Sequence, residues 1–289
     1  MNNCIFAKKI RFGVCLALAL MTLGSCDPEA PVAPTNNREE NLGTGNPSNA
    51  TTDVANETNY LIKKPQYTLS YNRTKETANW VAWHLSSDWK GAAVRQDVFK
   101  SDPDLPIGWY RVTTTNYTGT GFDRGHICPS DDRDGTQADN DATFYMTNMM
   151  PQSPNLNRIT WERLEAYCRT LVTQGNECYI IAGPEGQGGE GTNGTFGTLD
   201  NGHVVIPAQC WKVVIVLPVG INDLTRANNT TRVIAVLMPN RQNVTAHSWD
   251  YYRVSVRTIE QLTGFNFFIK LPQTLQDALE TSIDSGPTS

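Results

Sequence analysis

The chain has 289 residues, a net charge of −5 and 39% hydrophobic residues. This composition supports a globular core and excludes a wholly disordered protein. Beyond the first 26 residues, the sequence has no apolar run long enough to cross a membrane.

The first 26 residues have the pattern of an export signal. Basic residues precede the apolar run FGVCLALALMTLG, which is short for a membrane-spanning helix. The small residues LGS then precede Cys26. This arrangement resembles the lipobox of bacterial lipoproteins, in which the cysteine is acylated and becomes the new N-terminus; the alternative is an ordinary secretory signal. We expect an exported protein anchored to a bacterial membrane through Cys26, at the cell surface or in the periplasm.

Three further segments follow the signal. Residues 27–59 predict a disordered linker, because Pro, Asn, Thr and Gly dominate and large apolar residues are almost absent. Residues 60–272 have the length of one domain, and residues 273–289 form an acidic tail with a possible short helix at 275–283. The signal carries a charge of +3, the linker −5 and the tail −3, which leaves the domain neutral. A neutral domain does not attract polyanions through bulk charge.

Strands dominate the predicted domain. Runs rich in Val, Ile and aromatic residues, bounded by Pro, Asn or Gly, predict strands at 78–86, 178–183, 202–218 and 231–240. Another strand is expected to begin near Ala142 and to stop at Pro151. The longest helical pattern runs over residues 157–174, and a short helix at 258–264 has Thr258 as its expected N-cap. Many strands with one substantial helix predict an α+β fold around a mostly antiparallel sheet.

The predicted domain contains four cysteines: Cys128, Cys168, Cys178 and Cys210. Their spacing does not match a Cys/His metal site. In an exported chain, four cysteines allow two disulfides with three possible pairings. We favour Cys168 with Cys178, because only a short helix-to-strand connection separates them.

The stretch GFDRGHICPSDDR, residues 121–133, places His126 among many charged residues. A neutral imidazole accepts a proton near physiological pH, so His126 is either a polar turn residue or a general base. The other histidines are isolated and are expected to be structural or surface residues: His84, His203 and His247. Three acidic residues after the histidine lack the glycine and distal glutamate of an EF-hand and predict a solvated turn: Asp131, Asp132 and Asp134.

The long helical pattern also carries polar side chains at regular spacing. Residues four apart lie along one helix face, and here they are Asn157, Trp161, Glu165 and Arg169. This face offers an amide oxygen, a carboxylate and a guanidinium. The alternative is a solvated polar face with an incidental tryptophan.

The motif DRGH at 123–126, followed by NMMPQSPNLNRITWERLE, resembles the DNA/RNA non-specific endonuclease family, whose members have a ββα-metal site. The likeness extends from about Tyr67 to Pro272. The family's motif residues fall on Asp123, Arg124, Gly125, His126, Asn148, Pro151, Gln152, Asn157, Trp161 and Glu165. Further matches are Arg169 and, upstream, Arg95. The resemblance implies a central, mostly antiparallel sheet flanked by helices, with the metal-site residues on one long helix.

The resemblance implies that the chain hydrolyses phosphodiester bonds of DNA and RNA with the help of Mg2+ or Mn2+. His126 would act as the general base, and the amide oxygen of Asn157 would hold the metal ion. The rest of the implied catalytic set is Asp123, Arg124 and Glu165. The implied substrate-binding residues are Arg95, Arg169, Asn148 and Gln152.

Two other functions remain open on the sequence alone. One is a surface lipoprotein that binds nucleic acid without cleaving it. The other is a phosphodiesterase for small nucleotides, which would require a closed base pocket. The presence of both His126 and Asn157 favours the nuclease, because a binding protein needs neither residue.

Overall fold

The computed structural model describes Met1, Arg38 and residues 41–288. The predicted signal peptide after Met1, including Cys26, and the first part of the predicted linker lie outside the described residues, apart from Arg38. Among the helices of the described part, none has the length and apolar character needed to span a membrane.

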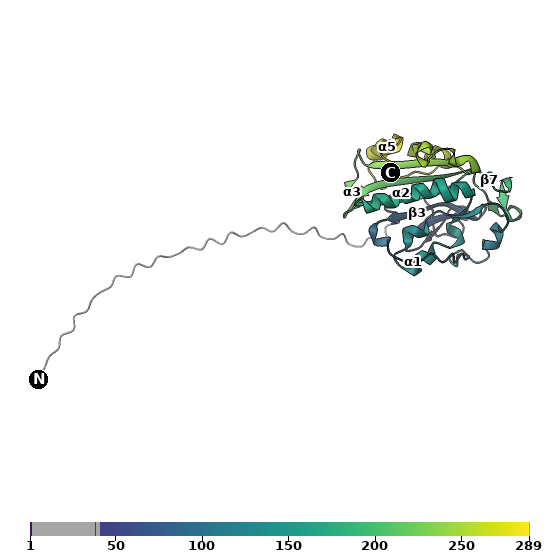
Figure 1. Cartoon of the computed structure of the whole chain (residues 1–289), viewed down its shortest axis with the longest axis horizontal. Coiled ribbons are helices and arrows are strands. Elements are labelled where there is room, and N and C mark those ends of the chain that lie inside the picture. Colours follow the sequence, from purple (N-terminus) through teal and green to yellow (C-terminus); the bar gives the residue numbers. More distant parts are fainter. Residues whose placement is uncertain (2–37, 39–40, 289) are drawn as a thin grey trace. The chain divides into compact units, whose positions relative to one another are not determined.

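A six-stranded sheet forms the centre of the domain (Figure 1). Its strands lie in the order β1-β2-β3-β6-β11-β12, and every neighbouring pair is antiparallel. The strands are β1 (Tyr60–Lys63), β2 (Thr68–Asn72), β3 (Thr77–Leu85), β6 (Asn176–Glu185), β11 (Gln209–Pro218) and β12 (Arg232–Pro239). Four of them overlap the strands predicted from sequence, and the predicted antiparallel α+β fold is confirmed.

Both faces of the sheet are covered, because successive residues of a strand point to opposite sides. In β3, Trp83 belongs to one hydrophobic core and Trp80 to the other. The first core also contains Leu164 of α2 (Glu162–Thr173), and the second contains residues of α4 (Val256–Thr263) and α5 (Gln273–Thr281). The sheet therefore separates α2 from α4 and α5.

The predicted long helix begins as a π-helix, η5 (Leu156–Trp161), and continues as α2. Gly175, with a φ of +86°, follows its C-terminus, a position where glycine is favoured. The N-cap of α4 is Ser255 rather than Thr258, because the Ser255 hydroxyl accepts a hydrogen bond from the Thr258 N–H at 3.1 Å.

Shorter elements surround the sheet. The strands are β4 (Asp123–His126), β5 (Met149–Gln152), β7 (Gly189–Gly191), β8 (Gly194–Phe196), β9 (Thr198–Leu199) and β10 (Val204–Val205). The α-helices are α1 (Gln137–Ala142) and α3 (Asp223–Arg226). The 3₁₀ helices are η1 (Ser87–Trp89), η2 (Thr114–Tyr117), η3 (Ser130–Arg133), η4 (Met146–Asn148), η6 (Asp200–Gly202), η7 (Gln242–Ala246) and η8 (Trp249–Tyr252).

Three further expectations from the sequence differ from the structure. Residues 41–59, assigned to the linker, pack on the domain instead, since Ala50 is buried and Thr51 bridges to Tyr60. Pro151 does not stop a strand: it lies inside β5, which pairs on one side only, with β4, and therefore tolerates proline. All four domain cysteines are buried free thiols, so the expected disulfide between Cys168 and Cys178 is absent.

Candidate active site

The site is built on a ββα unit. β4 and β5 pair antiparallel, with His126 opposite Met149 and Asp123 opposite Gln152. The chain then enters η5 and α2, which carry Asn157 and Glu165. A π-helical turn at this point is a feature often found at functional sites.

His126 lies at the end of β4 with its ring packed between aromatic side chains. The ring centroid is 4.7 Å from that of Phe144 and 5.7 Å from that of Phe99. Burial, helped by the positive charges of Arg95 and Arg124, lowers the pKa of His126 to about 3. The imidazole is therefore neutral at physiological pH, and its Nε2 forms no hydrogen bond with any described residue.

Asp123 fixes the orientation of Asn157. The Asn157 amide nitrogen donates to Asp123 Oδ2 at 2.9 Å, which leaves the amide oxygen on the opposite side of the group as a possible metal ligand. Arg158 makes a bidentate pair with the same carboxylate, at 2.8 and 2.6 Å. Asp123 itself lines the larger cavity, together with Asn157 and Arg158.

Glu165 contacts a buried lysine, Lys212. Its Oε1 accepts a hydrogen bond from Lys212 Nζ at 3.2 Å, and Lys212 is only 1% exposed. The lysine Nζ also lies 4.3 Å from the centroid of the Trp161 ring. Burial raises the pKa of Glu165 to about 7, and the nearby Lys212 opposes that rise.

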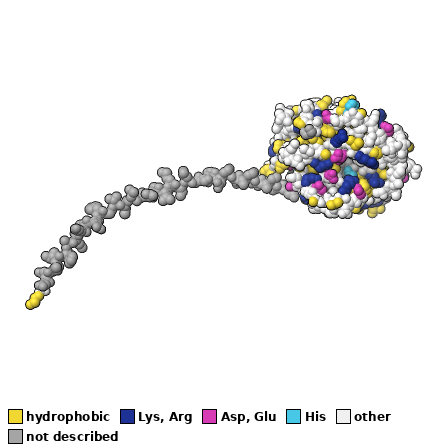
Figure 2. All heavy atoms as spheres, viewed as in Figure 1, with side chains coloured by type: hydrophobic (Ala, Val, Ile, Leu, Met, Phe, Trp, Pro, Cys, Tyr) yellow, Lys and Arg dark blue, Asp and Glu magenta, His cyan; other side chains and the backbone are white. Residues whose placement is uncertain are grey.

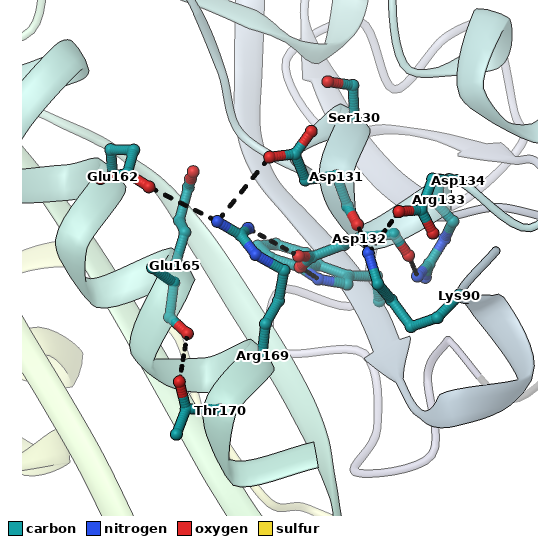
Figure 3. A network of polar contacts seen from close by, with 12 residues as sticks. Lys90, Ser130, Asp131, Asp132, Arg133, Asp134, Glu162, Glu165, Arg169 and Thr170 are labelled. Atoms are coloured by element: carbon teal, nitrogen blue, oxygen red, sulfur yellow. Dashed lines mark hydrogen bonds and ion pairs between the residues drawn. The ribbon is translucent and has the colours of Figure 1, made fainter. Parts of the chain in front are cut away.

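Arg169 is held by acidic residues on two sides (Figure 3). It pairs with Asp132 at 3.1 Å, and more loosely with Glu162 at 3.6 Å and Asp131 at 3.9 Å. Asp132 is buried and also accepts the indole N–H of Trp83 at 2.9 Å. The expectation that Asp132 lies in a solvated turn is therefore wrong.

Two connected cavities open over these residues. One has a volume of about 160 Å3 and is lined by residues that include His126, Glu165 and Arg169, and the other has about 520 Å3. Arg95, Arg124 and Asn157 line both cavities. Figure 2 shows Lys and Arg side chains gathered on one face of the domain, interspersed with acidic ones. The folded residues 41–288 carry a net charge of −5, so these basic side chains lie on a domain that is acidic as a whole.

Arg95 and Arg124 stack on the aromatic floor of the site. The guanidinium carbon of Arg124 lies 4.4 Å from the centroid of the Phe99 ring, and that of Arg95 lies 5.1 Å from that of Phe144. Arg95 also donates to Ser130 Oγ at 3.1 Å. The planar guanidinium group is well suited to binding phosphate oxygens.

Two residues that the sequence assigned to substrate binding are buried and line neither cavity. Asn148 is fully buried, and its side chain holds Cys128 through hydrogen bonds of 2.9 Å to both its N–H and its carbonyl. Gln152 is also fully buried, beneath Gly125: a Cβ at that glycine would meet Gln152 Oε1 at 1.9 Å. The glycine thus permits close packing against Gln152, and its φ is not positive.

Sequence reasoning missed three residues of the site: Lys212, Asp132 and Arg158. A lysine inside the apolar run CWKVVIVLP was the available signal, because a buried lysine requires a partner. The stripe of Asn157, Glu165 and Arg169 does face one cavity, whereas Trp161 packs in the core beside it.

A family model described as DNA/RNA non-specific endonuclease matches residues 44–274. The chain belongs to this family.

Curated relatives bear nuclease names. A protein named "Nuclease" from Nostoc sp. (strain PCC 7120) is 45% identical over 280 residues, covering 95% of this chain and 98% of the relative. "Nuclease C1" from Cunninghamella echinulata is 34% identical, covering 73% and 83%. "Endonuclease G, mitochondrial" from Homo sapiens is 28% identical, covering 72% and 69%. As a member of this family, the chain is a metal-dependent nuclease that hydrolyses phosphodiester bonds of nucleic acids.

Solved structures support the fold. A chain in a crystal structure of an EndoG/EndoGI complex superposes with a TM-score of 0.67 at 23% identity, covering 84% of this chain and 96% of the other. The nuclease therefore has the ββα-metal fold that its sequence implies.

Proposed function

We propose that this nuclease is a Mg2+-dependent endonuclease that cleaves DNA and RNA with little sequence preference, leaving 5'-phosphate and 3'-hydroxyl ends. The observation that carries the proposal is the imidazole of His126. The ring is neutral at physiological pH, its Nε2 makes no hydrogen bond within the described part of the chain, and it lines a cavity with Arg95 and Arg124. Burial and the charges of Arg95 and Arg124 make this imidazole a weak base in the free site, and a phosphate bound to the two arginines would offset their charges and raise its pKa toward the range of a general base.

The donor groups beside His126 suit Mg2+. We assign the amide oxygen of Asn157 as the protein ligand, because the amide nitrogen donates a hydrogen bond to Asp123 and the oxygen remains available. Mg2+ prefers oxygen ligands and keeps several waters, and Glu165 would accept hydrogen bonds from those waters. When bound, the ion would neutralise the phosphate and stabilise the leaving 3'-oxygen. Mn2+ also accepts oxygen ligands and would serve as a substitute.

Arginine side chains would hold the phosphate. Arg95, Arg124 and Arg169 line the smaller cavity, and their guanidinium groups offer paired N–H donors. Because residues 41–288 carry a net charge of −5, attraction would depend on this local cluster and the metal ion rather than on a broad basic surface.

Substitution of His126 tests the base. The His126→Ala variant is expected to nick supercoiled plasmid and to degrade RNA at least about 100-fold more slowly than the wild type. The matched control is His247→Ala, because this exposed histidine stacks on Tyr251 outside both cavities. A folded His126→Ala protein that cuts both substrates at the wild-type rate would contradict the proposal. A wild-type chain that binds nucleic acid without cutting it would favour the non-catalytic lipoprotein.

We also propose that the nuclease is exported and held on a membrane through a lipid on Cys26. Support comes from the sequence alone: a basic start, a short apolar run and the residues LGSC.

A further inference from the structure

We propose that His84, Glu177 and Asp223 form a second metal site, suited to a divalent transition-metal ion such as Zn2+. The site would fix α3 to the sheet. It goes beyond the proposed nuclease mechanism and does not rest on it.

Three elements bring the residues together. His84 lies in β3 opposite Tyr179 of β6, and Glu177 lies two residues before Tyr179 on the same face of the sheet. Asp223 is the first residue of α3. All three side chains are buried, and one potential ligand atom from each lies within 4.8 Å of the others.

The imidazole of His84 lacks the contacts expected of a buried histidine. It is 2% exposed, yet neither ring nitrogen makes a hydrogen bond with any residue in the described part of the chain. Nε2 lies 3.3 Å from Glu177 Oε2. Two ligands of one tetrahedral Zn2+, each about 2.0–2.2 Å from the ion, lie roughly 3.3 Å apart. The spacing thus fits two ligands of one ion, and a metal bond would satisfy the orphaned nitrogen.

The carboxylates of Glu177 and Asp223 share one arginine, Arg226. Arg226 donates to Glu177 Oε1 at 2.5 Å and to Asp223 Oδ1 at 2.8 Å. The second oxygen of Glu177, Oε2, approaches His84 Nε2. The second oxygen of Asp223, Oδ2, accepts the hydroxyl of Tyr179, whose ring stacks on the imidazole at 4.5 Å. One guanidinium balances one of two buried carboxylates, and a cation would balance the other.

The chemical types of the three ligand groups indicate which metal ion would bind. One imidazole and two carboxylates suit Zn2+ and its neighbours, whereas Mg2+ takes oxygen ligands and keeps its waters. The site is also separate from the proposed catalytic ion. Glu177 follows the C-terminus of α2 and Asn157 precedes its N-terminus, and a helix of 12 residues spans about 18 Å.

Zinc binding by the full chain carrying Asn157→Ala tests the proposal, because this background lacks the amide assigned to the catalytic ion. Equilibrium dialysis against Zn2+ in excess Mg2+, followed by metal analysis, is expected to give one Zn2+ per chain. The Tm is expected to rise by about 5 °C or more, and EDTA to reverse the rise. Adding His84→Ala should abolish both effects. Adding His203→Ala, which removes an exposed histidine instead, should leave them unchanged.

A second substitution covers the case in which His84→Ala fails to fold. Asp223→Asn keeps the volume of a side chain at the start of a short surface helix and should weaken Zn2+ binding at least tenfold. Co2+ bound to the folded chain should show the visible absorption of a low-symmetry, four-coordinate site. No bound Zn2+, or unchanged Zn2+ binding in either variant, would overturn the proposal. The nuclease assignment would survive that result, since the readouts do not involve cleavage.

Discussion

Burial of the Glu165 side chain disfavours the charged form of its carboxyl group. Burial raises its pKa to about 7, although Lys212 donates a hydrogen bond to it. The pKa of His126 is lowered to about 3, so this histidine does not titrate between pH 6 and 8. Between pH 6 and 8, in the metal-free site, we therefore expect Glu165 rather than His126 to titrate.

Binding of Mg2+ is expected to release a proton from Glu165. Below pH 7 the metal-free carboxyl is mostly protonated, and the ion favours the charged form, so the Kd for Mg2+ should tighten as pH rises from about 6 to 8. Calorimetry in two buffers of different ionisation enthalpy measures the released proton. The Glu165→Gln variant should release none. Equal proton release by both proteins would remove Glu165 from the metal site.

Lys212 positions Glu165 without lining either cavity. In the Lys212→Met variant the buried carboxyl loses its positive neighbour, so its pKa should rise further. We expect kcat/KM at pH 7 to fall about 10- to 100-fold, with partial recovery at higher pH. Lys270→Met, at an exposed lysine, is the matched control. A pH profile identical to that of the wild type would show that Lys212 is only structural.

Local spacing was sufficient to find much of this site. DRGH and the fourfold spacing of Asn157, Glu165 and Arg169 depend on neighbours within one strand or one helix. The partners of those residues do not: Lys212 is 47 residues from Glu165, and Asp132 is 37 residues from Arg169. These contacts are made where α2 packs against β11 and η3, and periodicity does not encode such packing.

At the scale of elements, the strands were predictable where both faces are apolar, as in β6 and β11. The segment 41–59 was not, because its attachment uses polar groups. Ser48 Oγ accepts the indole N–H of buried Trp80 at 2.8 Å, and the Leu61 N–H donates to the carbonyl of Thr51 at 2.8 Å. A low hydrophobic content therefore did not imply disorder here.

Removal of this segment should weaken the fold. A chain that begins at Tyr60 leaves the Trp80 indole and the Leu61 N–H without partners, and each loss costs about 1–3 kcal/mol if the group stays buried. Urea unfolding should therefore show a lower midpoint than for a chain that begins at Asn41. Coincident unfolding curves would show that residues 41–59 contribute nothing to stability.

At the scale of the whole molecule, the lipid anchor is tested by localisation. The Cys26→Ser variant should lose membrane attachment or fail to mature, because serine provides no thiol for acylation. Fractionation and N-terminal sequencing of the mature protein provide the measurement. A variant that stays on the membrane with an unchanged N-terminus would exclude the anchor, and nuclease activity would still be expected.

The ion pair between Lys212 and Glu165 is expected to support activity while lowering the stability of the fold. Each charge loses hydration worth several kcal/mol, and apolar side chains of similar volume often pack as well or better in such places. A double variant, Lys212→Leu with Glu165→Leu, should therefore unfold at a temperature no lower than the wild type while being inactive. A more stable form of this domain would then be an inactive one, and a double variant that unfolds at a clearly lower temperature than the wild type would contradict this.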